Sequence, residues 1–551
     1  TLSFAVEHKF FGSDPFVYHL DNLLLHIINS LLVFVLAQRL GLSVVAAFGA
    51  ALLFGVHPMR VESVAWVTER KDLLYAFFYL LALLQYMNYL KEKMPLPYAA
   101  FFLFGVLSLL AKPMALSLPL ICFLIDWFQR REFSWQAMAE KLPIVAVFVP
   151  VVWITYCLHV RNPIDNPMEA LLTWAWSFGF YIWKFIWPSV LVPIYHVPQP
   201  VSLGNPAYVF SLLFVIGIIW SLWKFFNNRW WIFAVGFYVF SIFFLLRYDS
   251  AKDINVVADR FMYLPSLGFC LIGGLVAEHL IRLFEARSLR WKIAAQIFLY
   301  AVICLLALKS VGQTLVWNNS LVLWDYVIRH NPTEFLAYND RAVEYINRKQ
   351  YDLALADYGA ILKFDPDNAD AFFNRGILLA QIGRHRSAIN DFTRVTELFP
   401  HYEKGYYRRA KSFAALGEDQ FAFADYNRTI AANPSFPDGY LERGNIYNHQ
   451  GEFNRAIKDY DKVIELEPKN ARAVNNRGTI HAKLLQDESA LADFNKAAEL
   501  DPNYAEAYYN RSIIRTRQGR FKEALEDAEK SRNLGAEAPE GYIEGLKNSA
   551  Q

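Results

Sequence analysis

Charged side chains gather in one short stretch between two apolar segments. HPMRVESVAWVTERKDLL, residues 57–74, holds three cations and three carboxylates beside one histidine. The flanking segments are apolar enough to cross a bilayer, and ionisable residues near a hydrocarbon region are costly unless they serve a function. Lysine and arginine can hold a phosphate group there, and a neighbouring carboxylate can accept a proton from an attacking hydroxyl. The stretch therefore predicts a binding site for a lipid-linked phosphate.

Ionisable residues also interrupt three other apolar segments. Lys112 lies in LLAKPMAL, Lys184 in YIWKFIWP, and the pair Asp259 and Arg260 in VVADRFMYLP. Such positions favour function over surface anchoring, because an unpaired charge is expensive in lipid. His26, by contrast, lies on an apolar segment where a histidine is more often a hydrogen-bonded core residue than a ligand.

The ligand that suits these residues best is a polyprenyl phosphate that carries a sugar. Cations would hold the phosphate and stabilise it as it leaves, so the reaction needs no nucleotide, and no metal site is expected. The sequence contains no P-loop, dinucleotide fingerprint, HExxH motif or paired CxxC motif. The expected phosphate ligands are Arg60, Arg70, Lys71, Lys112, Lys184 and Arg260, and the expected supporting residues are His57 and Asp259.

The two halves of the 551-residue chain differ in composition. Apolar segments alternate with short polar loops up to His330, and charged residues are dense beyond it. There are 24 Lys and Arg against 18 Asp and Glu before Asn331, and 30 against 34 from there on, so neither half has the basic surplus of a nucleic-acid-binding protein. All four cysteines lie in apolar segments, which predicts small buried side chains and no disulfide framework.

Ten apolar segments of the first half are expected to cross the membrane. An eleventh, 172–192, contains Lys184 and Pro188 and is either a full span or a re-entrant helix buried in protein. The ten expected spans are 17–39, 43–57, 72–90, 98–111, 114–128, 142–160, 207–226, 230–246, 263–282 and 293–311.

Lysine and arginine mark the cytoplasmic ends of membrane segments. Arg130 and Arg131 fall on one side with the basic residues of four other loops if 172–192 does not change sides. The 57–72 loop and the C-terminal half then lie outside the cytoplasm, as expected for a multi-pass membrane protein with an extracytoplasmic tail. Anion binding explains the cations that go against this bias, which are Arg60, Arg70, Lys71, Arg247, Lys252 and Arg260.

The second half is a repeat array. Prolines recur every 34 residues, which is the tetratricopeptide period, and arginine and aspartate recur in register with them. This predicts an α-solenoid of six repeats, and one further period back, Ser320 and Trp324 predict a half-repeat that follows the last span directly. The recurring residues are Pro332, Pro366, Pro400, Pro434, Pro468 and Pro502; Arg341, Arg375, Arg409, Arg443, Arg477 and Arg511; and Asp357, Asp391, Asp425, Asp459, Asp493 and Asp527.

Two interpretations of the arginine and aspartate ladders are open. They could clamp the terminus of a peptide, or each arginine could pair with an aspartate on a neighbouring helix, which we favour. An aromatic stripe could likewise line the concave surface or fill helix-packing core. In either case the concave surface suits an extended polypeptide. The stripe consists of Tyr338, Phe372, Tyr406, Tyr440 and Tyr508.

Four membrane stretches, followed by the repeat array, carry a family resemblance. They are HPMRVESVAWVTERKDLLYAFFYLLALLQY, LLAKPMALSLPLICFLIDWF, YIWKFIWPSVLVPIYH and VVADRFMYLPSLGF. The chain resembles the transmembrane-and-tetratricopeptide-repeat O-mannosyltransferase family and its prokaryotic relatives. The resemblance implies the GT-C glycosyltransferase fold, a lipid-linked sugar donor and action on the extracytoplasmic face. We therefore expect an all-α chain with a polytopic GT-C-like domain at 1–315 and a repeat solenoid with a C-terminal helix at 316–551.

The resemblance also bears on the catalytic base. In that fold the acidic base lies in the first outer loop, just after the first span. The sequence resembles the family only from late in that loop onward, without the first span, so the base is expected upstream of Thr1. Within the sequence, Glu62 and Asp72 are the remaining candidates for this role.

The expected function is transfer of a sugar such as mannose from a polyprenyl-phosphate donor to Ser or Thr of a protein acceptor, outside the cytoplasm. The alternative is a catalytically inert relative that acts as a scaffold or accessory subunit of a membrane assembly, with the solenoid docking a protein partner. Acidic residues just after the first span would favour the enzyme, and their absence would favour the scaffold. Both interpretations involve membrane lipid and a polypeptide partner, and neither involves nucleic acid.

Overall fold

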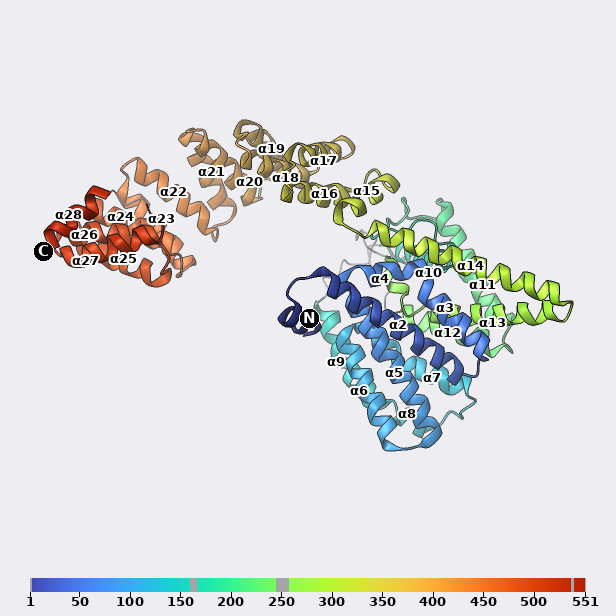
Figure 1. The fold of residues 1–551 in the computed structure, drawn as a ribbon. Coiled ribbons are helices and arrows are strands. Elements are labelled where there is room, and N and C mark those ends of the chain that lie inside the picture. Colours follow the sequence, from blue (N-terminus) through green and yellow to red (C-terminus); the bar gives the residue numbers. More distant parts are fainter. Residues whose placement is uncertain (1, 159–165, 244–256, 537–539, 551) are drawn as a thin grey trace. The chain divides into compact units, whose positions relative to one another are not determined.

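The computed structural model describes residues 2–158, 166–243, 257–536 and 540–550. Every regular element in these ranges is a helix, so the predicted all-α class is confirmed. The chain forms two compact units, Thr1–Glu334 and Phe335–Gln551 (Figure 1). The expected half-repeat is the helix α15 (Ser320–His330), which belongs to the first unit. The domain boundary at 315/316 stays a prediction.

The first unit consists of apolar helices whose starts follow from the local sequence. Asp14, Ser43, Asn166, Asn228 and Ser288 each accept a hydrogen bond from a backbone N–H of the first helical turn. The helices before α15 are α1 (Leu2–Phe11), α2 (Pro15–Arg39), α3 (Val44–Val56), η1 (Pro58–Arg60), α4 (Val61–Ala65), η2 (Val67–Glu69), α5 (Arg70–Glu92), α6 (Pro95–Ala111), η3 (Pro113–Ser117), α7 (Leu118–Phe128), α8 (Trp135–Ala139), α9 (Leu142–Leu158), α10 (Pro167–Ile186), α11 (Pro206–Lys224), α12 (Arg229–Ile242), η5 (Asp259–Met262), α13 (Leu267–Glu285) and α14 (Leu289–Val316).

Among the described residues, five helices are long and apolar enough to cross a membrane. They are Pro15–Arg39, Val67–Glu92, Pro206–Lys224, Leu267–Glu285 and Leu289–Val316. The bent pair Val44–Val56 and Pro58–Ala65 makes a sixth if it is a single span. Several spans in one chain make this a multi-pass membrane protein.

The other predicted spans correspond to shorter apolar helices. These are Pro95–Ala111, Pro113–Phe128, Leu142–Val151 and Arg229–Ile242. The ends of the predicted spans 142–160 and 230–246, together with Arg247 and Lys252, lie outside the described residues.

Small and aromatic residues allow the helices of the first unit to pack closely. α5 lies against α6, and Tyr79 and Tyr86 of α5 are fully buried. α13 crosses α3 at Gly274, where a Cβ atom would collide with the carbonyl oxygen of Ala46 and lie 3.0 Å from the amide nitrogen of Ala50. Glycine is therefore required at this crossing, and the crossing fixes α3, from which the 57–72 stretch continues.

The apolar segment 172–192 is helical only in its first part. α10 ends at Ile186, just before Pro188, and the chain then runs without regular structure to Asn205. α14 holds this irregular stretch, because Gln313 donates a hydrogen bond to the carbonyl of Leu191 at 2.8 Å. The last turn of α10 therefore carries Lys184 to the start of the irregular stretch.

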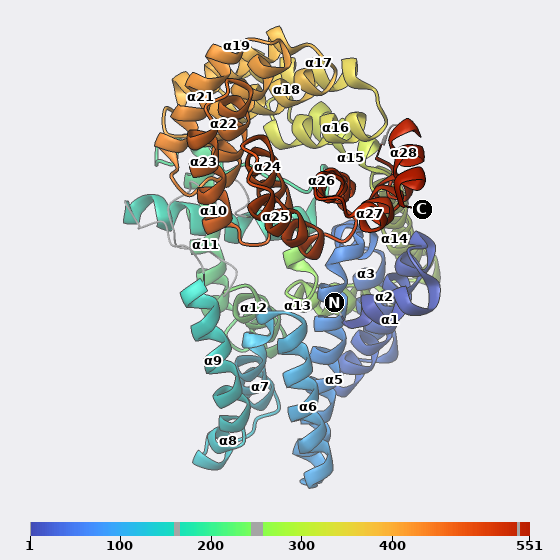
Figure 2. The same cartoon turned by 90° about the vertical axis from the view of Figure 1, so that its left-hand side faces the viewer.

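The second unit is a series of paired antiparallel helices followed by one more helix, and they wind into a superhelical arc (Figure 2). Each pair corresponds to one predicted repeat. The helices are α16 (Phe335–Asn347), α17 (Tyr351–Phe364), α18 (Ala369–Gln381), α19 (His385–Leu398), α20 (Glu403–Ala415), α21 (Asp419–Ala432), α22 (Pro437–His449), α23 (Phe453–Leu466), α24 (Ala471–Lys483), α25 (Asp487–Leu500), α26 (Ala505–Arg517), α27 (Phe521–Asn533) and α28 (Glu540–Ala550).

Each repeat arginine binds the aspartate of the second helix in its own repeat. Arg443 donates to Asp459 from Nε at 2.8 Å and from Nη2 at 2.6 Å. The ring of Tyr440, one turn before Arg443, has its centre 5.5 Å from the guanidinium carbon. The interpretation of the ladders as repeat interface is therefore confirmed. The same arginine–aspartate hydrogen bonds recur in Arg341–Asp357, Arg375–Asp391, Arg409–Asp425, Arg477–Asp493 and Arg511–Asp527.

Candidate functional site

The charged stretch between α3 and α5 folds as a chain of short helical turns. η1, α4 and η2 follow α3 in succession, with a bend of 55° after Val56. Pro58 stands at the first position of η1, where its lack of an N–H is tolerated. The bend leaves the last carbonyls of α3 without partners inside the helix.

Three side chains from different elements satisfy these carbonyls. The donors come from α2, η1 and α14, so α3 ends inside protein rather than in open lipid. His26 is one of them, which confirms it as a hydrogen-bonded core residue. The pairs are His26 Nε2 with Gly55 O at 2.9 Å, Arg60 Nε with Phe54 O at 3.2 Å, and Ser310 Oγ with Val56 O at 2.6 Å.

Arg60 and His57 are held by further protein contacts. Arg60 also donates from Nη1 to the carbonyl of Met262 at 2.8 Å, and its guanidinium lies 4.3 Å from the ring centre of Phe54. His57 Nε2 donates to the carbonyl of Phe185 at 2.9 Å, and the two rings stack at 4.4 Å. Both residues therefore fasten the end of α3 to η5 and α10.

Arg70 and Lys71 begin α5 in different surroundings. Arg70 is 2% exposed, donates to Asn22 Oδ1 at 2.8 Å and forms an ion pair with Glu7. The side chain of Lys71 is half exposed and lies 3.3 Å from Glu69 Oε1. Arg70 therefore anchors α1 and α2 to α5, whereas Lys71 remains accessible.

Arg260 is the centre of a buried group of charges. Its backbone N–H donates to Glu62 Oε2 at 2.9 Å and its Nη1 to Glu62 Oε1 at 2.5 Å. Glu69 Oε1 lies 3.7 Å from Arg260 Nε. Burial favours the neutral guanidine, but Glu62, Glu69 and Asp72 outweigh it and raise the pKa of Arg260. Arg260 is therefore a permanent cation in a mostly buried position.

Lys112 brings a second cation to the same group. Its ammonium pairs with Asp72 of α5, and Asp72 also accepts a hydrogen bond from Ser63 at 3.4 Å. The Lys112 nitrogen lies 5.4 Å, and the Arg260 guanidinium carbon 5.1 Å, from the ring centre of Phe261. The two cations thus approach one aromatic ring from distant parts of the chain, Lys112 from between α6 and η3 and Arg260 from η5.

Asp259 lies between this group and Lys184. Its Oδ2 accepts a hydrogen bond from the Tyr195 hydroxyl at 2.7 Å, and Oδ1 has no partner among the described residues. Burial raises the pKa of Asp259 well above its ordinary value, Glu62 raises it further, and the nearby charge of Lys184 opposes both. Asp259 therefore holds its proton to a higher pH than a solvated aspartate does. We call the following six residues the charged cluster: Glu62, Glu69, Asp72, Lys112, Asp259 and Arg260.

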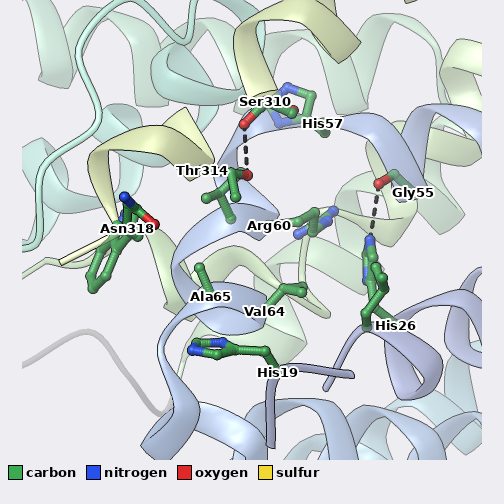
Figure 3. A pocket seen from close by; sticks show the side chains of 13 residues that line it. His19, His26, Gly55, His57, Arg60, Val64, Ala65, Ser310, Thr314 and Asn318 are labelled. Atoms are coloured by element: carbon green, nitrogen blue, oxygen red, sulfur yellow. Dashed lines mark hydrogen bonds between the residues drawn. The ribbon is translucent and has the colours of Figure 1, made fainter. Parts of the chain in front are cut away.

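A pocket of about 400 Å³ lies beside the same stretch (Figure 3). Figure 3 shows His19 and His26 on one wall and Ser310 and Thr314 on another. Of the predicted site residues, only His57 and Arg60 line this pocket. The residues of the charged cluster do not line it, so the cluster and the pocket are separate features.

The structure thus groups part of the predicted site and disperses the rest. Arg60, His57 and Arg70 are fastened to other parts of the fold, and Lys71 is at the surface. Tyr195 and Phe261 are contacts that the sequence did not single out, because neither has a local signal and both meet the cluster only through the tertiary fold. No group of three or more His, Cys, Asp or Glu in the described ranges could hold a metal ion. The predicted residues in or beside the cluster are Glu62, Asp72, Lys112, Lys184, Asp259 and Arg260.

Comparisons with known proteins identify the second unit first. The family model described as TPR repeat matches residues 344–383 and 444–484, and models described as tetratricopeptide repeat match 471–504 and 494–526. Among solved structures, the crystal structure of MamA protein is 29% identical, with a TM-score of 0.29, and the match covers 31% of this chain and 94% of that one. The family models therefore confirm the predicted tetratricopeptide array.

Curated relatives extend the comparison to the first unit. Protein O-mannosyl-transferase F38B6.6 of Caenorhabditis elegans is 25% identical over 66% of this chain and 53% of its own length. Protein O-mannosyl-transferase TMTC3 of Mus musculus is 24% identical over 68% of this chain and 45% of its own length. The chain spans about half the length of the curated relatives it matches.

Each of these matches covers more residues than either compact unit holds, so the similarity extends over both units. The predicted resemblance is therefore confirmed: the chain is a distant homologue of the TMTC protein O-mannosyl-transferases, with membrane helices followed by tetratricopeptide repeats.

Proposed function

We propose that the protein transfers a sugar such as mannose from a polyprenyl phosphate to Ser or Thr of a polypeptide, on the extracytoplasmic side of the membrane. One observation carries the proposal: two buried cations, Arg260 and Lys112, meet at one ring inside a multi-pass helical unit. The distant relationship to protein O-mannosyl-transferases supports the reaction type. The donor, the acceptor and the side of the membrane are parts of the proposal.

Arg260 and Lys112 bind the phosphate of the donor. Their side chains are only 19% and 11% exposed, so a phosphate oxygen that reaches them loses little of its attraction to solvent screening. Both have N–H groups beyond those that bind Glu62 and Asp72. As the bond between the sugar carbon and the phosphate oxygen breaks, negative charge grows on the phosphate, and the two cations stabilise it.

The carboxylates of the cluster set the positions of these cations. Glu62 binds both the backbone N–H and the guanidinium of Arg260, and Asp72 binds the ammonium of Lys112. Either carboxylate could accept the proton of the acceptor hydroxyl once the phosphate takes over its cation. Arg60 and Arg70 have structural roles in this proposal, because their contacts hold α3 and α1 in place.

The repeat unit presents the polypeptide acceptor. A tetratricopeptide array offers an extended concave surface, and such arrays commonly mediate protein–protein contacts. The arginine and aspartate ladders are already engaged within the repeats, so the acceptor meets the exposed side chains between them. In this proposal the acceptor hydroxyl attacks the sugar carbon while its proton passes to a carboxylate.

The test is a transfer assay in membranes that contain the protein. Radiolabelled decaprenyl-phosphate mannose and a Ser/Thr-rich peptide are supplied, and label on the peptide is measured. We expect transfer by the unaltered protein and a large loss in Lys112→Gln, with Lys91→Gln at the far end of α5 as the matched lysine control. Absence of transfer from decaprenyl-phosphate mannose by a well-folded protein would favour the inert scaffold instead.

A further inference from the structure

The pocket between α2, α4 and the end of α14 has no part in the donor site proposed above. Its volume is about 400 Å³ (Figure 3). Val61, Val64 and Ala65 line it, and their spacing of three and four residues places them on one face of α4. Leu23 of α2 also lines the pocket and is 47% exposed. The pocket therefore offers apolar surface at an accessible position.

Three of the four ionisable side chains that line this pocket are already engaged by other protein groups. Arg60 donates hydrogen bonds from all three of its guanidinium nitrogens. His26 and His57 each form hydrogen bonds at both ring nitrogens. The fourth side chain, His19, is exposed. An anion in the pocket would therefore meet few free donors, which favours an uncharged ligand.

Neutral polar groups lie where α14 ends at the pocket. The indole N–H of Trp317 is buried and has no hydrogen-bond partner among the described residues. A buried N–H without an acceptor is costly, so an oxygen that reaches it would be stabilised. The exposed amide of Asn318 can both donate and accept. Such groups match the alternating carbonyl and N–H groups of a polypeptide backbone, whereas a hydrocarbon chain would satisfy none of them.

Two tryptophans connect this pocket to the charged cluster. The ring of Trp317 lies 5.7 Å from the ring of Trp66, and the guanidinium carbon of Arg260 lies 5.4 Å from that second ring. Glu62, which binds Arg260, belongs to the same helix α4 that forms the apolar wall. An extended chain advances about 3.3 Å per residue, so about three residues reach from the pocket to the cluster.

We propose that this pocket binds an uncharged aliphatic side chain of the acceptor polypeptide, about three residues from the Ser or Thr that receives the sugar. The inference rests on the proposed function, in which a polypeptide is the acceptor. It adds a site within the first unit that selects among acceptor sequences. An aliphatic residue packs against α4 there, whereas an aspartate at the same place would lose its hydration without gaining a cation.

The experiment is photo-cross-linking of a peptide to the purified full-length protein in detergent. The photo-reactive amino acid p-benzoylphenylalanine replaces Leu23, or Leu31, which is 60% exposed about two turns further along α2 and outside the pocket. The probes are two biotinylated polyalanine peptides with one Thr each. Leu stands three residues before and three after this Thr in one peptide, and Asp stands there in the other. At position 23 we expect about tenfold more cross-linking of the Leu peptide than of the Asp peptide, and only background at position 31.

Variants test the wall of the pocket separately. Ala65→Phe fills the pocket, so it should lower cross-linking of the Leu peptide at position 23 by about tenfold and raise the KM of that peptide in sugar transfer to that of the Asp peptide. Ala65→Ser changes the volume little and should behave as the unaltered protein does. Trp317→Phe keeps a ring but loses the N–H, so it should weaken peptide binding about fivefold, as the loss of one neutral hydrogen bond predicts. Thermal unfolding of each variant confirms that it is folded.

Equal cross-linking of the two peptides at position 23, or cross-linking that Ala65→Phe leaves unchanged, would overturn the inference. Recovery of phospholipid instead of peptide at position 23, with the protein in phosphatidylcholine vesicles, would also overturn it and assign the pocket to an acyl chain. The proposed function fails separately. Cross-linking of the Leu peptide without any sugar transfer contradicts only the enzyme, whereas transfer that does not distinguish the two peptides contradicts only the pocket.

Discussion

Ion pairs occur in both units, but they are built in two ways. In the repeat unit the same arginine–aspartate pair recurs sixteen residues apart in the sequence, with two hydrogen bonds each time. In the first unit Arg260 binds Glu62, which is 198 residues away, and Lys112 binds Asp72, which is 40 residues away. The repeated pair joins the two helices of every repeat, whereas Arg260–Glu62 and Lys112–Asp72 occur only in the charged cluster.

The two kinds of ion pair also differ in how completely their carboxylate oxygens are hydrogen-bonded. In a repeat such as that of Arg443 and Asp459, both carboxylate oxygens accept hydrogen bonds from the arginine. In the first unit, Glu69 Oε2 and Asp259 Oδ1 have no partner among the residues described. A buried polar atom without a partner is costly, and in the charged cluster two such atoms lie beside the cations that we propose bind the phosphate.

A pair of matched arginine variants tests the difference between the two kinds of ion pair most directly. Arg260→Gln should lower sugar transfer by about 2 to 3 kcal/mol, or roughly 30- to 150-fold, because charge-assisted hydrogen bonds to the phosphate are lost. Arg443→Gln should leave the rate per folded molecule unchanged. Initial transfer rates at saturating acceptor measure both. Equal losses in the two variants would show that the cluster, too, is structural.

Two glycines allow helix packing to be compared between the first unit and the repeat unit. Gly274→Ala places a Cβ atom against the backbone of α3, which cannot move aside, and should destabilise the first unit by about 2 kcal/mol. Gly444→Ala meets side-chain atoms instead of backbone, and the nearest is a Tyr460 ring carbon at 2.8 Å. Its effect should be smaller. Thermal unfolding of the full chain, followed separately for each unit by hydrogen exchange, would contradict this order if Gly444→Ala were the more damaging.

The repeated pair should matter for stability alone. Arg443→Gln removes both bonds to Asp459, which is 5% exposed, and should lower the unfolding free energy of the repeat unit by about 1.5 kcal/mol. Denaturant unfolding of residues 335–551 measures this value. Arg455→Gln, whose partner Glu452 lies on the exposed surface, is the control and should change the value by less than about 0.5 kcal/mol.

The smallest expected effect concerns pH. His196 binds Glu334, and this hydrogen bond raises the pKa of His196 above its ordinary value despite partial burial. The stabilisation is therefore fully present below about pH 6.5 and is lost as the pH rises through the raised value. His196→Gln should flatten the unfolding temperature of the first unit across this range. Its effect stays below about 1 kcal/mol because the imidazole is half exposed. A steeper pH dependence of the unfolding temperature in the variant would contradict this prediction.

The repeats were predictable almost completely because their signals are local. A proline every 34 residues sets the helix ends, and an arginine–aspartate spacing of sixteen fixes the pair that joins the two helices of a repeat. Apolar length alone also located the membrane helices, but four of the predicted spans are shorter apolar helices in the described residues. The pairing of Arg443 with Asp459 required no knowledge of distant parts of the chain.

The candidate site was predictable only as a collection of residue types. The sequence showed that Arg60, Arg70 and Arg260 stand where cations are costly, but gave no way to tell their roles apart. Arg70 is bound by Glu7 and Arg60 by the carbonyl of Met262, and only the tertiary fold brings these groups together.

The bend at the end of α3 affects the order in which the chain can fold during synthesis. Membrane segments emerge from the ribosome in order, yet the carbonyl of Val56 is satisfied by Ser310, which is synthesised 254 residues later. Until α14 is synthesised, that carbonyl faces lipid or water without its final donor, so the C-terminal end of α3 can settle only late in biogenesis. We expect a cysteine introduced within residues 54–60 to be accessible to a cysteine-modifying reagent in a ribosome-stalled chain that ends before α14, and to be protected in the finished chain.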